Sequence, residues 1–136
     1  MQWILVLALA ADLAGVKSEP NLEKRSDRAL DYANAALDAA RDAYNKGDYD
    51  ASKADLEEVG ASVDLAYEAL EKTGKDPRRD PKWFKRAEMR TRELLRRLEG
   101  LRETFSFYDR PSVETVRDHI SVIHDNLLQA IMSKRK

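Results

Sequence analysis

The two histidines are the residues of this chain that could most readily bind a metal ion or a haem. His119 and His124 lie five residues apart in a segment whose apolar pattern predicts a helix. On a helix, that spacing turns two side chains about 140° away from each other, so they cannot ligate one ion together. The chain has no cysteine and no Glu-x-x-His motif, the arrangement that holds iron pairs in helical bundles. We therefore expect ordinary helix histidines beside Asp118 and Asp125, and no metal or cofactor.

Carboxylates that could do acid–base chemistry are concentrated in the segment 57–71, at Glu57, Glu58, Asp64, Glu68 and Glu71. A catalytic pair of carboxylates must be held in a cleft with pKa values that differ from each other. These five side chains lie mostly outside the apolar positions of their segment, which predicts a solvated acidic face. The sequence therefore predicts no catalytic residue, and we expect that the protein is not an enzyme.

Basic side chains are concentrated in the next part of the chain. Residues 19–71 hold 14 acidic and 6 basic side chains, whereas residues 72–102 hold 5 acidic and 12 basic ones. Arginines beside aromatic residues can bind phosphates and stack on bases, but the basic segment can also pair with the acidic one inside a single fold. The net charge of the whole chain is −1, which gives no general attraction for nucleic acid or membranes. Internal pairing is therefore the favoured interpretation.

The start of the basic segment combines arginines with aromatic residues, types that are enriched in the energetic centres of protein interfaces. We expect the partner contact in and just after the loop at 77–84, at Arg78, Arg79, Trp83, Phe84 and Arg86. The expected partner is another protein, and nucleic acid is not expected. The alternative is an anion, lipid or nucleic-acid binder that uses the basic third helix, which predicts steeply salt-dependent binding to polyanions.

The elements that must position these residues are helices. Apolar residues recur at spacings of three and four from residue 20 onward, which predicts amphipathic helices around one core. No segment shows the alternation of a strand. We expect four buried stripes: Ala29, Ala33, Ala36, Ala40 and Ala43; Tyr49, Ser52, Leu56, Val59, Val63, Ala66 and Leu70; Phe84, Ala87, Thr91, Leu94, Leu98, Leu101 and Phe105; and Val113, Val116, Ile120, Ile123, Leu127 and Ala130 or Ile131.

Turn residues separate these stripes. Gly47 and Gly74 end the first two helices, Asp48 caps the second, and Pro81 is expected as the first residue of the third. The pattern breaks again at 106–110. Short connections between helices of roughly 20–25 residues favour antiparallel neighbours. The sequence predicts an all-α, antiparallel up-down-up-down four-helix bundle, with a three-helix bundle as the alternative.

The first 18 residues differ from the rest. Residues 3–11 read WILVLALAA, an unbroken apolar run. Nine apolar residues span about 14 Å as a helix, too short for a stable membrane span, but they match the apolar region of a signal peptide. We expect residues 1–18 to be a signal peptide, residues 19–136 to be a single helical-bundle domain, and the protein to be periplasmic or secreted. Alternatively, the run is an apolar helix that packs on the domain, and the protein is cytoplasmic.

Two stretches resemble known helical proteins. Residues 36–51, ALDAARDAYNKGDYDA, are similar to the inter-helix turn of a tetratricopeptide repeat, where an aromatic residue, a Gly-Asp-Tyr turn and small residues close a helical hairpin. No period of about 34 residues follows, so the resemblance implies one hairpin and not a stack of repeats. Residues 73–88 and 94–100 resemble uncharacterised exported bacterial helical proteins, a resemblance that implies no functional residue.

The composition, 43% hydrophobic and 36% charged residues, suits a single domain of packed amphipathic helices. From these observations we expect a non-enzymatic, exported helical-bundle protein that acts through protein–protein contact. The stripe of alanines could also pack between subunits, which leaves a homo-oligomer as an open alternative.

Overall fold

The computed structural model describes residues 13–133, and those residues are almost entirely helical, with no strand among them. The prediction of an all-α chain is confirmed. Four long helices carry the fold: α2 (Leu22–Asn45), α3 (Tyr49–Lys72), α4 (Lys82–Thr104) and α5 (Arg110–Met132). Their lengths of 23 or 24 residues leave only short connections between them.

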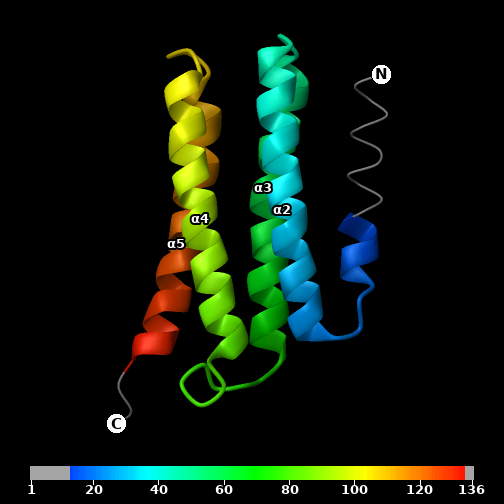
Figure 1. Ribbon diagram of the computed structural model, residues 1–136, viewed down its shortest axis with the longest axis vertical. Helices are drawn as coiled ribbons and strands as arrows, with labels where there is room; N and C mark the ends of the chain where they lie inside the picture. The colour runs from blue at the N-terminus through cyan, green and yellow to red at the C-terminus, as the bar shows by residue number, and fades with distance from the viewer. Residues whose placement is uncertain (1–12, 134–136) are drawn as a thin grey trace.

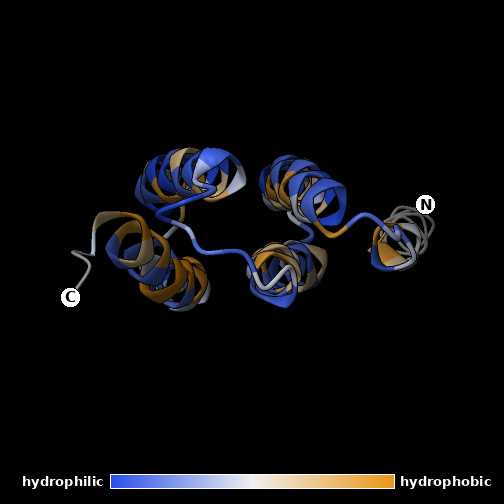
Figure 2. Cartoon of the chain, turned by 90° about the horizontal axis from the view of Figure 1, so that it is seen from below, coloured by the Kyte–Doolittle hydropathy of each residue, from blue (hydrophilic) through white to orange (hydrophobic). Residues whose placement is uncertain are grey.

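The four helices lie side by side along the long axis of the molecule (Figure 1). α2 and α4 run in one direction, and α3 and α5 run in the other. The most extensive contacts join α2 to α3 and α4 to α5, so the chain forms two helical hairpins of almost equal length. The hairpins meet along α2 and α4 and along α3 and α5, which Figure 2 shows end-on.

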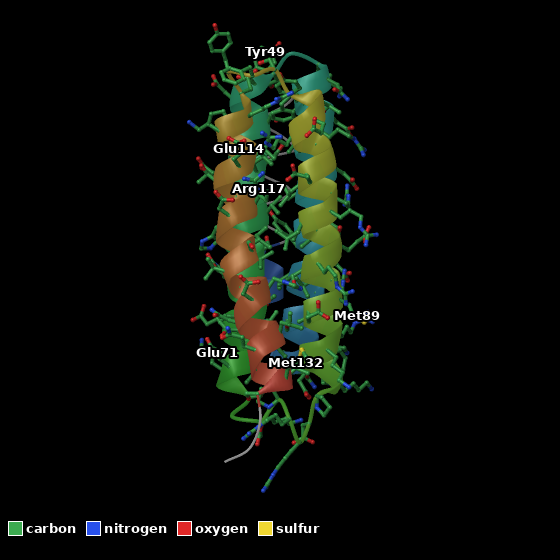
Figure 3. All side chains as sticks on the ribbon, turned by 90° about the vertical axis from the view of Figure 1, so that its left-hand side faces the viewer. Tyr49, Glu71, Met89, Glu114, Arg117 and Met132 are labelled. Carbon is green, nitrogen blue, oxygen red and sulfur yellow. The ribbon has the colours of Figure 1, made fainter. Side chains whose placement is uncertain are left out.

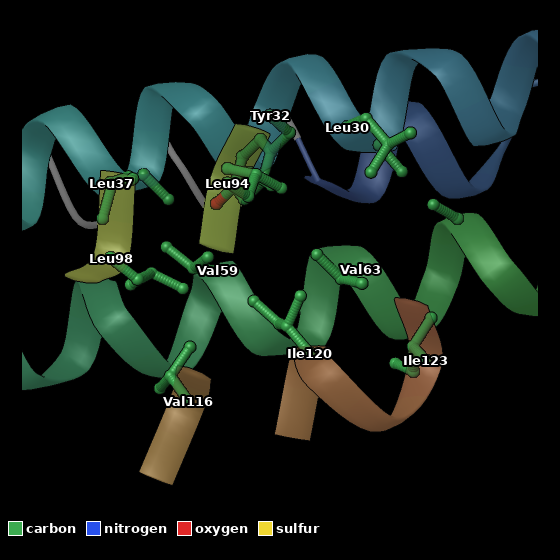
Figure 4. Close-up of a cluster of buried hydrophobic side chains, with 14 of the residues drawn as sticks. Leu30, Tyr32, Leu37, Val59, Val63, Leu94, Leu98, Val116, Ile120 and Ile123 are labelled. Atoms are coloured by element: carbon green, nitrogen blue, oxygen red, sulfur yellow. The ribbon is translucent and has the colours of Figure 1, made fainter. Parts of the chain in front are cut away.

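The core lies between these helices and is built from the predicted apolar stripes. Leu37, Val59, Leu98 and Ile120, one from each long helix, are at most 2% exposed, and Figure 4 shows them in one cluster. The part of α2 that faces the core is mostly alanine, which lets the backbones of α2 and α3 approach closely. Burial of such side chains contributes about 25 cal/mol per Å² of apolar surface removed from water. The core therefore holds the helices together, and the chain has no cysteine that could add a disulfide.

Two predicted positions differ from the structure. Tyr49 belongs to the predicted stripe of α3 but is 56% exposed, because it is the first residue of the helix and lies at the end of the core. Pro81 precedes α4 and is not its first residue. Its backbone angles are already helical, and its carbonyl oxygen accepts from the Lys85 N–H at 2.7 Å. The predicted helix start was therefore wrong by one residue.

The turns between helices follow the predicted chemistry. Gly47 and Gly74 have φ values of +82° and +70°, in the left-handed region that favours glycine. The side chain of Asp48 accepts from the Ala51 N–H at 3.2 Å and so caps α3. The predictions of Gly47, Asp48 and Gly74 as boundary residues are confirmed.

Residues 13–17 form a short helical segment that packs on the domain. Leu13 and Val16 are 9% and 5% exposed and belong to the same core cluster as the long helices. The backbone oxygen of Glu19 accepts from Arg25 Nε at 2.8 Å, which ties the segment to the first turn of α2. The apolar run at 3–11 lies outside the described residues. None of the helices within 13–133 combines the length and the apolar character that a membrane span requires.

Candidate functional site

Three of the predicted contact residues lie at the linker end, the end of the molecule where residues 73–81 connect α3 to α4 and so join the two hairpins. The Arg78 side chain lies 3.4 Å from Asp76 Oδ1, and Arg79 is exposed and makes no ion pair within the described part of the chain. Trp83 is partly buried against the core, and Lys82 Nζ lies 5.3 Å from the centre of its ring. Arg78, Arg79 and Trp83 are thus placed where another protein could reach them.

The other two predicted contact residues, Phe84 and Arg86, make contacts within the chain. Phe84 is 5% exposed and is part of the hydrophobic core. Arg86 donates two hydrogen bonds to the carboxylate of Asp27, at 2.5 and 3.2 Å. The structure therefore does not bring all five residues together on one surface.

The arginines of α4 face a row of carboxylates on α2. Asp27 accepts from Arg86 and, at 2.9 Å, from Arg90, which also donates to Asp31 at 2.5 Å. Two turns further along, Arg97 pairs with Asp38 and donates to Asn34 at 2.8 Å. We call this set the α2–α4 ladder: Asp27, Asp31, Asn34 and Asp38 of α2 with Arg86, Arg90 and Arg97 of α4.

The ladder sets the electrostatics of the basic helix. Burial alone would raise the pKa of Asp27, but hydrogen bonds from Arg86 and Arg90 outweigh it, and the pKa lies below its ordinary value. Each of these two guanidinium groups donates hydrogen bonds to carboxylates of α2. The segmental charge imbalance is thus explained by contacts between the two hairpins.

A second group of ion pairs joins α4 to α5. Arg102 Nε lies 2.6 Å from Glu114 Oε2, and Arg117 Nη1 lies 3.0 Å from Glu99 Oε2. Figure 3 labels Glu114 and Arg117 on this side of the molecule. Arginines of α4 thus form ion pairs with carboxylates of both neighbouring helices, α2 and α5.

Glu88 is the centre of a partly buried polar cluster between α4 and α5. Its carboxylate accepts from Arg92 at 2.9 and 3.0 Å, and its Oε2 lies 2.7 Å from Nε2 of His124. The burial of Glu88 would raise its pKa, but hydrogen bonds from Arg92 and His124 bring the pKa below its ordinary value. No serine, threonine or cysteine hydroxyl or thiol is bonded to His124 within residues 13–133, so the cluster has no nucleophile that this histidine activates.

The two histidines have separate partners. His119 Nε2 lies 2.7 Å from Asp64 Oδ1 on α3, whereas His124 lies beside Glu88 on α4. Within the described residues no three histidine, cysteine or carboxylate side chains are grouped in a way that could hold a metal ion. The histidines therefore join helices to one another.

Asp55 is a buried carboxylate of a different kind. It is 5% exposed. Burial raises its pKa to about 6, with added repulsion from Glu58 and Asp48. A buried carboxylate with a raised pKa lowers the stability of the fold at a pH where it is ionised.

The end of the molecule opposite the linker carries half of the aromatic residues of the chain. We call it the aromatic end, made up of Tyr44, Tyr49, Phe105, Phe107 and Tyr108. The Tyr44 ring stacks on Phe105 with 3.7 Å between centroids, and its other neighbour, Tyr49, lies 5.0 Å away. These three rings close the core where α2 and α4 end.

The Tyr44 hydroxyl also organises the turn before α5. It donates to Asp109 Oδ2 at 2.9 Å and accepts from the Ser106 N–H at 2.8 Å. The Ser106 hydroxyl donates to the same oxygen of Asp109 at 2.7 Å. These bonds hold residues 106–109 in a defined turn that presents the next two aromatic side chains.

Those side chains, Phe107 and Tyr108, point away from the core. They are 79% and 90% exposed, the highest values among the exposed large hydrophobic residues within 13–133. Figure 3 shows this end at the top, where Tyr49 is labelled. Beside the turn lies a pocket of about 270 Å³ that is lined by Tyr44, Tyr49 and Tyr108. The aromatic end is thus the best candidate for a contact surface.

The apolar pattern predicts residues 106–110 only as a break between helices. The signal for a contact surface is the pair of adjacent aromatic residues Phe107-Tyr108, which stands outside the apolar periodicity of both neighbouring helices. Aromatic residues that no core can accommodate are candidates for contact with another molecule.

Comparisons of this chain with protein families, with curated proteins and with solved structures find no match. The candidate site therefore rests on the geometry of the chain itself.

Proposed function

We propose that this chain is a non-enzymatic, exported helical protein that acts through contact with another protein, and that the aromatic end is its contact surface. The observation that carries the proposal is the exposure of Phe107 and Tyr108, at 79% and 90%, in one turn. Two neighbouring aromatic rings in water are unfavourable for an isolated molecule and favourable at the centre of an interface.

The order of the turn adds support. Tyr44, Ser106 and Asp109 hold its backbone and side chains by hydrogen bonds. A surface that is already ordered loses little conformational entropy when a partner binds. The two rings are therefore presented in a form suited to binding.

The proposal includes a fold in which residues 19–136 are one autonomous domain, an antiparallel up-down-up-down four-helix bundle. The opposite directions of successive helices in Figure 1 and the shared core favour this arrangement over a three-helix bundle. The four helices would then form a rigid base for the aromatic end and for the linker end.

An anion, lipid or nucleic-acid binder that uses the basic helix has less support. Arg86, Arg90 and Arg97 are committed to the α2–α4 ladder, and Arg102 is paired with Glu114. An external phosphate would have to compete with these carboxylates for the guanidinium groups. We expect no binding to a polyanion such as heparin or single-stranded DNA at about 50 mM salt, conditions under which phosphate contacts are strongest.

Export is supported by the sequence, through the apolar run at 3–11. The burial of Leu13 and Val16 supports the competing interpretation, in which this segment stays on the domain. The two interpretations differ in the N-terminus of the native protein, which can be measured.

Site-specific photo-crosslinking tests the contact surface. A photo-reactive phenylalanine analogue is placed at Tyr108, at Arg79 or at Met89, in cells that make the protein. Met89 is an exposed hydrophobic residue on α4 and is the control. We expect a crosslinked protein from position 108 only. Crosslinking from position 79 alone would move the contact to the linker end, and no crosslink from either position would refute the proposal.

A further inference from the structure

The pocket at the aromatic end has a distinct chemical character. It lies between the turn that precedes α3 and the turn that precedes α5, and its volume is about 270 Å³. Its lining combines three tyrosines, Tyr44, Tyr49 and Tyr108, with two carboxylates, Asp50 and Asp109. Electron-rich rings and carboxylates in one pocket both favour a positively charged occupant.

The aromatic faces that a ligand could reach belong to two of the tyrosines. Tyr44 is stacked on Phe105 and tilted against Tyr49, so most of its ring is covered. Tyr49 and Tyr108 are 56% and 90% exposed. Their rings can therefore pack on a cationic group, which is attracted to the negative face of an aromatic ring.

The carboxylates also retain capacity to accept hydrogen bonds. Asp109 receives the hydroxyls of Tyr44 and Ser106 on a single oxygen, Oδ2, and no described residue donates to its other carboxylate oxygen. Asp50 makes no ion pair or side-chain hydrogen bond within residues 13–133. Both acids can thus receive N–H groups from outside the chain.

Lys53 is the basic side chain among the lining residues, and it could oppose a cation. It also lines a neighbouring groove of about 240 Å³ that contains Glu57, one turn further along α3. Because Glu57 follows Lys53 by four residues, the Lys53 ammonium group can pair with Glu57 and so lie outside the pocket at the aromatic end. The charged side chains of the lining are two carboxylates and one lysine, so the pocket carries a net negative charge.

We propose that this pocket receives the cationic end of a lysine or arginine side chain from the partner protein. The inference rests on the proposed function, because Phe107 and Tyr108 beside the pocket would contact the apolar surroundings of that side chain. A guanidinium or ammonium group would donate to Asp50 and Asp109 while its alkyl stem packs on Tyr49 and Tyr108.

The test is a titration of the isotope-labelled protein followed by the NMR shifts of its backbone amides. The probes are the N-acetyl methylamides of lysine, arginine and norleucine; the last has a similar chain without the charge. Tetramethylammonium is a fourth probe, which carries charge without an N–H donor. We expect saturable shifts at 49–53 and 105–110 with the lysine and arginine compounds, weakened by added salt.

The variant that tests the pocket is Asp50→Asn combined with Tyr108→Leu, since both side chains are exposed and their replacement leaves the core intact. We expect its apparent affinity for the lysine or arginine compound to fall about five- to tenfold, the effect of losing one exposed ion pair and one cation–π contact. Asp80→Asn, at the opposite end, is the matched control and should bind as the wild type does.

Several outcomes would overturn the inference. These are equal shifts with the norleucine compound, unchanged binding by the double variant, shifts confined to the linker end, or binding of tetramethylammonium in preference to the amino-acid compounds. The proposed function can fail independently. Absence of crosslinks from position 108 combined with specific binding of the lysine compound would leave a cation pocket without the protein contact.

Discussion

The ring of Tyr44 lies flat on the ring of Phe105, with 3.7 Å between centroids and 9° between planes. Tyr44 belongs to the last turn of α2, and Phe105 follows the last turn of α4. One stacked pair thus connects the ends of the two hairpins and, through the Tyr44 hydroxyl, fixes the turn that exposes Phe107 and Tyr108. Stability and the candidate contact surface are therefore linked at this end of the molecule.

Removal of the Tyr44 hydroxyl should loosen that turn. In Tyr44→Phe the stack remains, but Asp109 loses a donor and the Ser106 N–H loses its acceptor. We expect the free energy of unfolding, measured by urea denaturation, to fall by about 1–2 kcal/mol. Tyr49→Phe is the control, because the Tyr49 hydroxyl forms no hydrogen bond with a described residue, and its effect should be within about 0.5 kcal/mol. Equal effects of the two changes would contradict this account.

Arg90 should be the most important arginine of the α2–α4 ladder for stability. Its side chain is 19% exposed and lies between Asp27 and Asp31. We expect Arg90→Met to cost about 1–2 kcal/mol at low salt, because two carboxylates lose a partner. Arg96→Met removes an arginine whose side chain is 75% exposed and should cost less than about 0.5 kcal/mol. A melting temperature of Arg90→Met no lower than that of Arg96→Met would show that the ladder contributes little.

Glu88→Gln should destabilise the protein at neutral pH and not in acid. Hydrogen bonds from Arg92 and His124 lower the pKa of Glu88 in the folded state. The stability that this provides is present above the unfolded value of about 4.3 and is lost as the pH falls through the lower folded value. We expect a loss of about 1–2 kcal/mol at pH 7 that shrinks below pH 4 or so. Urea denaturation across this range measures it, with the exposed Glu93→Gln as the control. A loss that stays constant down to pH 2 would point to packing instead of charge.

Asp55→Asn should have the opposite effect. Because the folded pKa of Asp55 is raised to about 6, the folded state binds more protons than the unfolded state between about pH 4 and pH 6, and wild-type stability falls as the pH rises through this window. We expect Asp55→Asn to raise the free energy of unfolding by about 1–3 kcal/mol at pH 7 and to flatten that fall. Glu57→Gln, on the exposed side of α3, is the control. A destabilised Asp55→Asn protein at pH 7 would argue that the carboxylate has a favourable partner.

The native N-terminus should distinguish the two interpretations of the first 18 residues. If the segment is a signal peptide, mass spectrometry of the native protein should find Glu19 as its first residue. In the full-length chain, Val16→Asp should lower stability by about 2–4 kcal/mol, since it places a charge at a position that is 5% exposed. Lys17→Asp, at an exposed neighbour, should have little effect. Native protein that still contains Val16 would contradict removal of the segment.

Much of the helical framework could be predicted from local pattern. Stripe residues such as Leu56, Leu98 and Ile120 are buried because a spacing of three and four places them on one side of a helix. Gly47 and Gly74 could be recognised because the conformation they adopt is unfavourable for other residues. The buried stripes and the helix ends each depend on a few neighbouring residues, so they can be predicted from the sequence without knowledge of the tertiary structure.

The side-chain partners could be predicted only in part. Glu88 precedes Arg92 by four residues, a spacing that favours an ion pair on a helix, and the pair is present. Glu93 precedes Arg97 by the same spacing, but Arg97 pairs with Asp38 of α2 instead. The choice depends on how α2 and α4 are placed relative to each other, which no local pattern reveals. The same holds for Phe84, which could be expected in a core stripe and in a contact surface alike.

The α2–α4 ladder repeats its charges at intervals of one or two helical turns, with a constant difference of 59 between the numbers of the paired residues Arg86–Asp27, Arg90–Asp31 and Arg97–Asp38. If α4 slipped by one turn along α2, Arg90 would remain opposite Asp27, and Arg86 would come opposite Glu23. In that alignment Arg97 would lie opposite Asn34, so two of the three arginines would still face a carboxylate. Charge attraction alone therefore discriminates weakly between the two alignments. The stacked rings of Tyr44 and Phe105 have no second alignment, so this aromatic pair, together with the packed core, selects the register that the salt bridges specify only weakly.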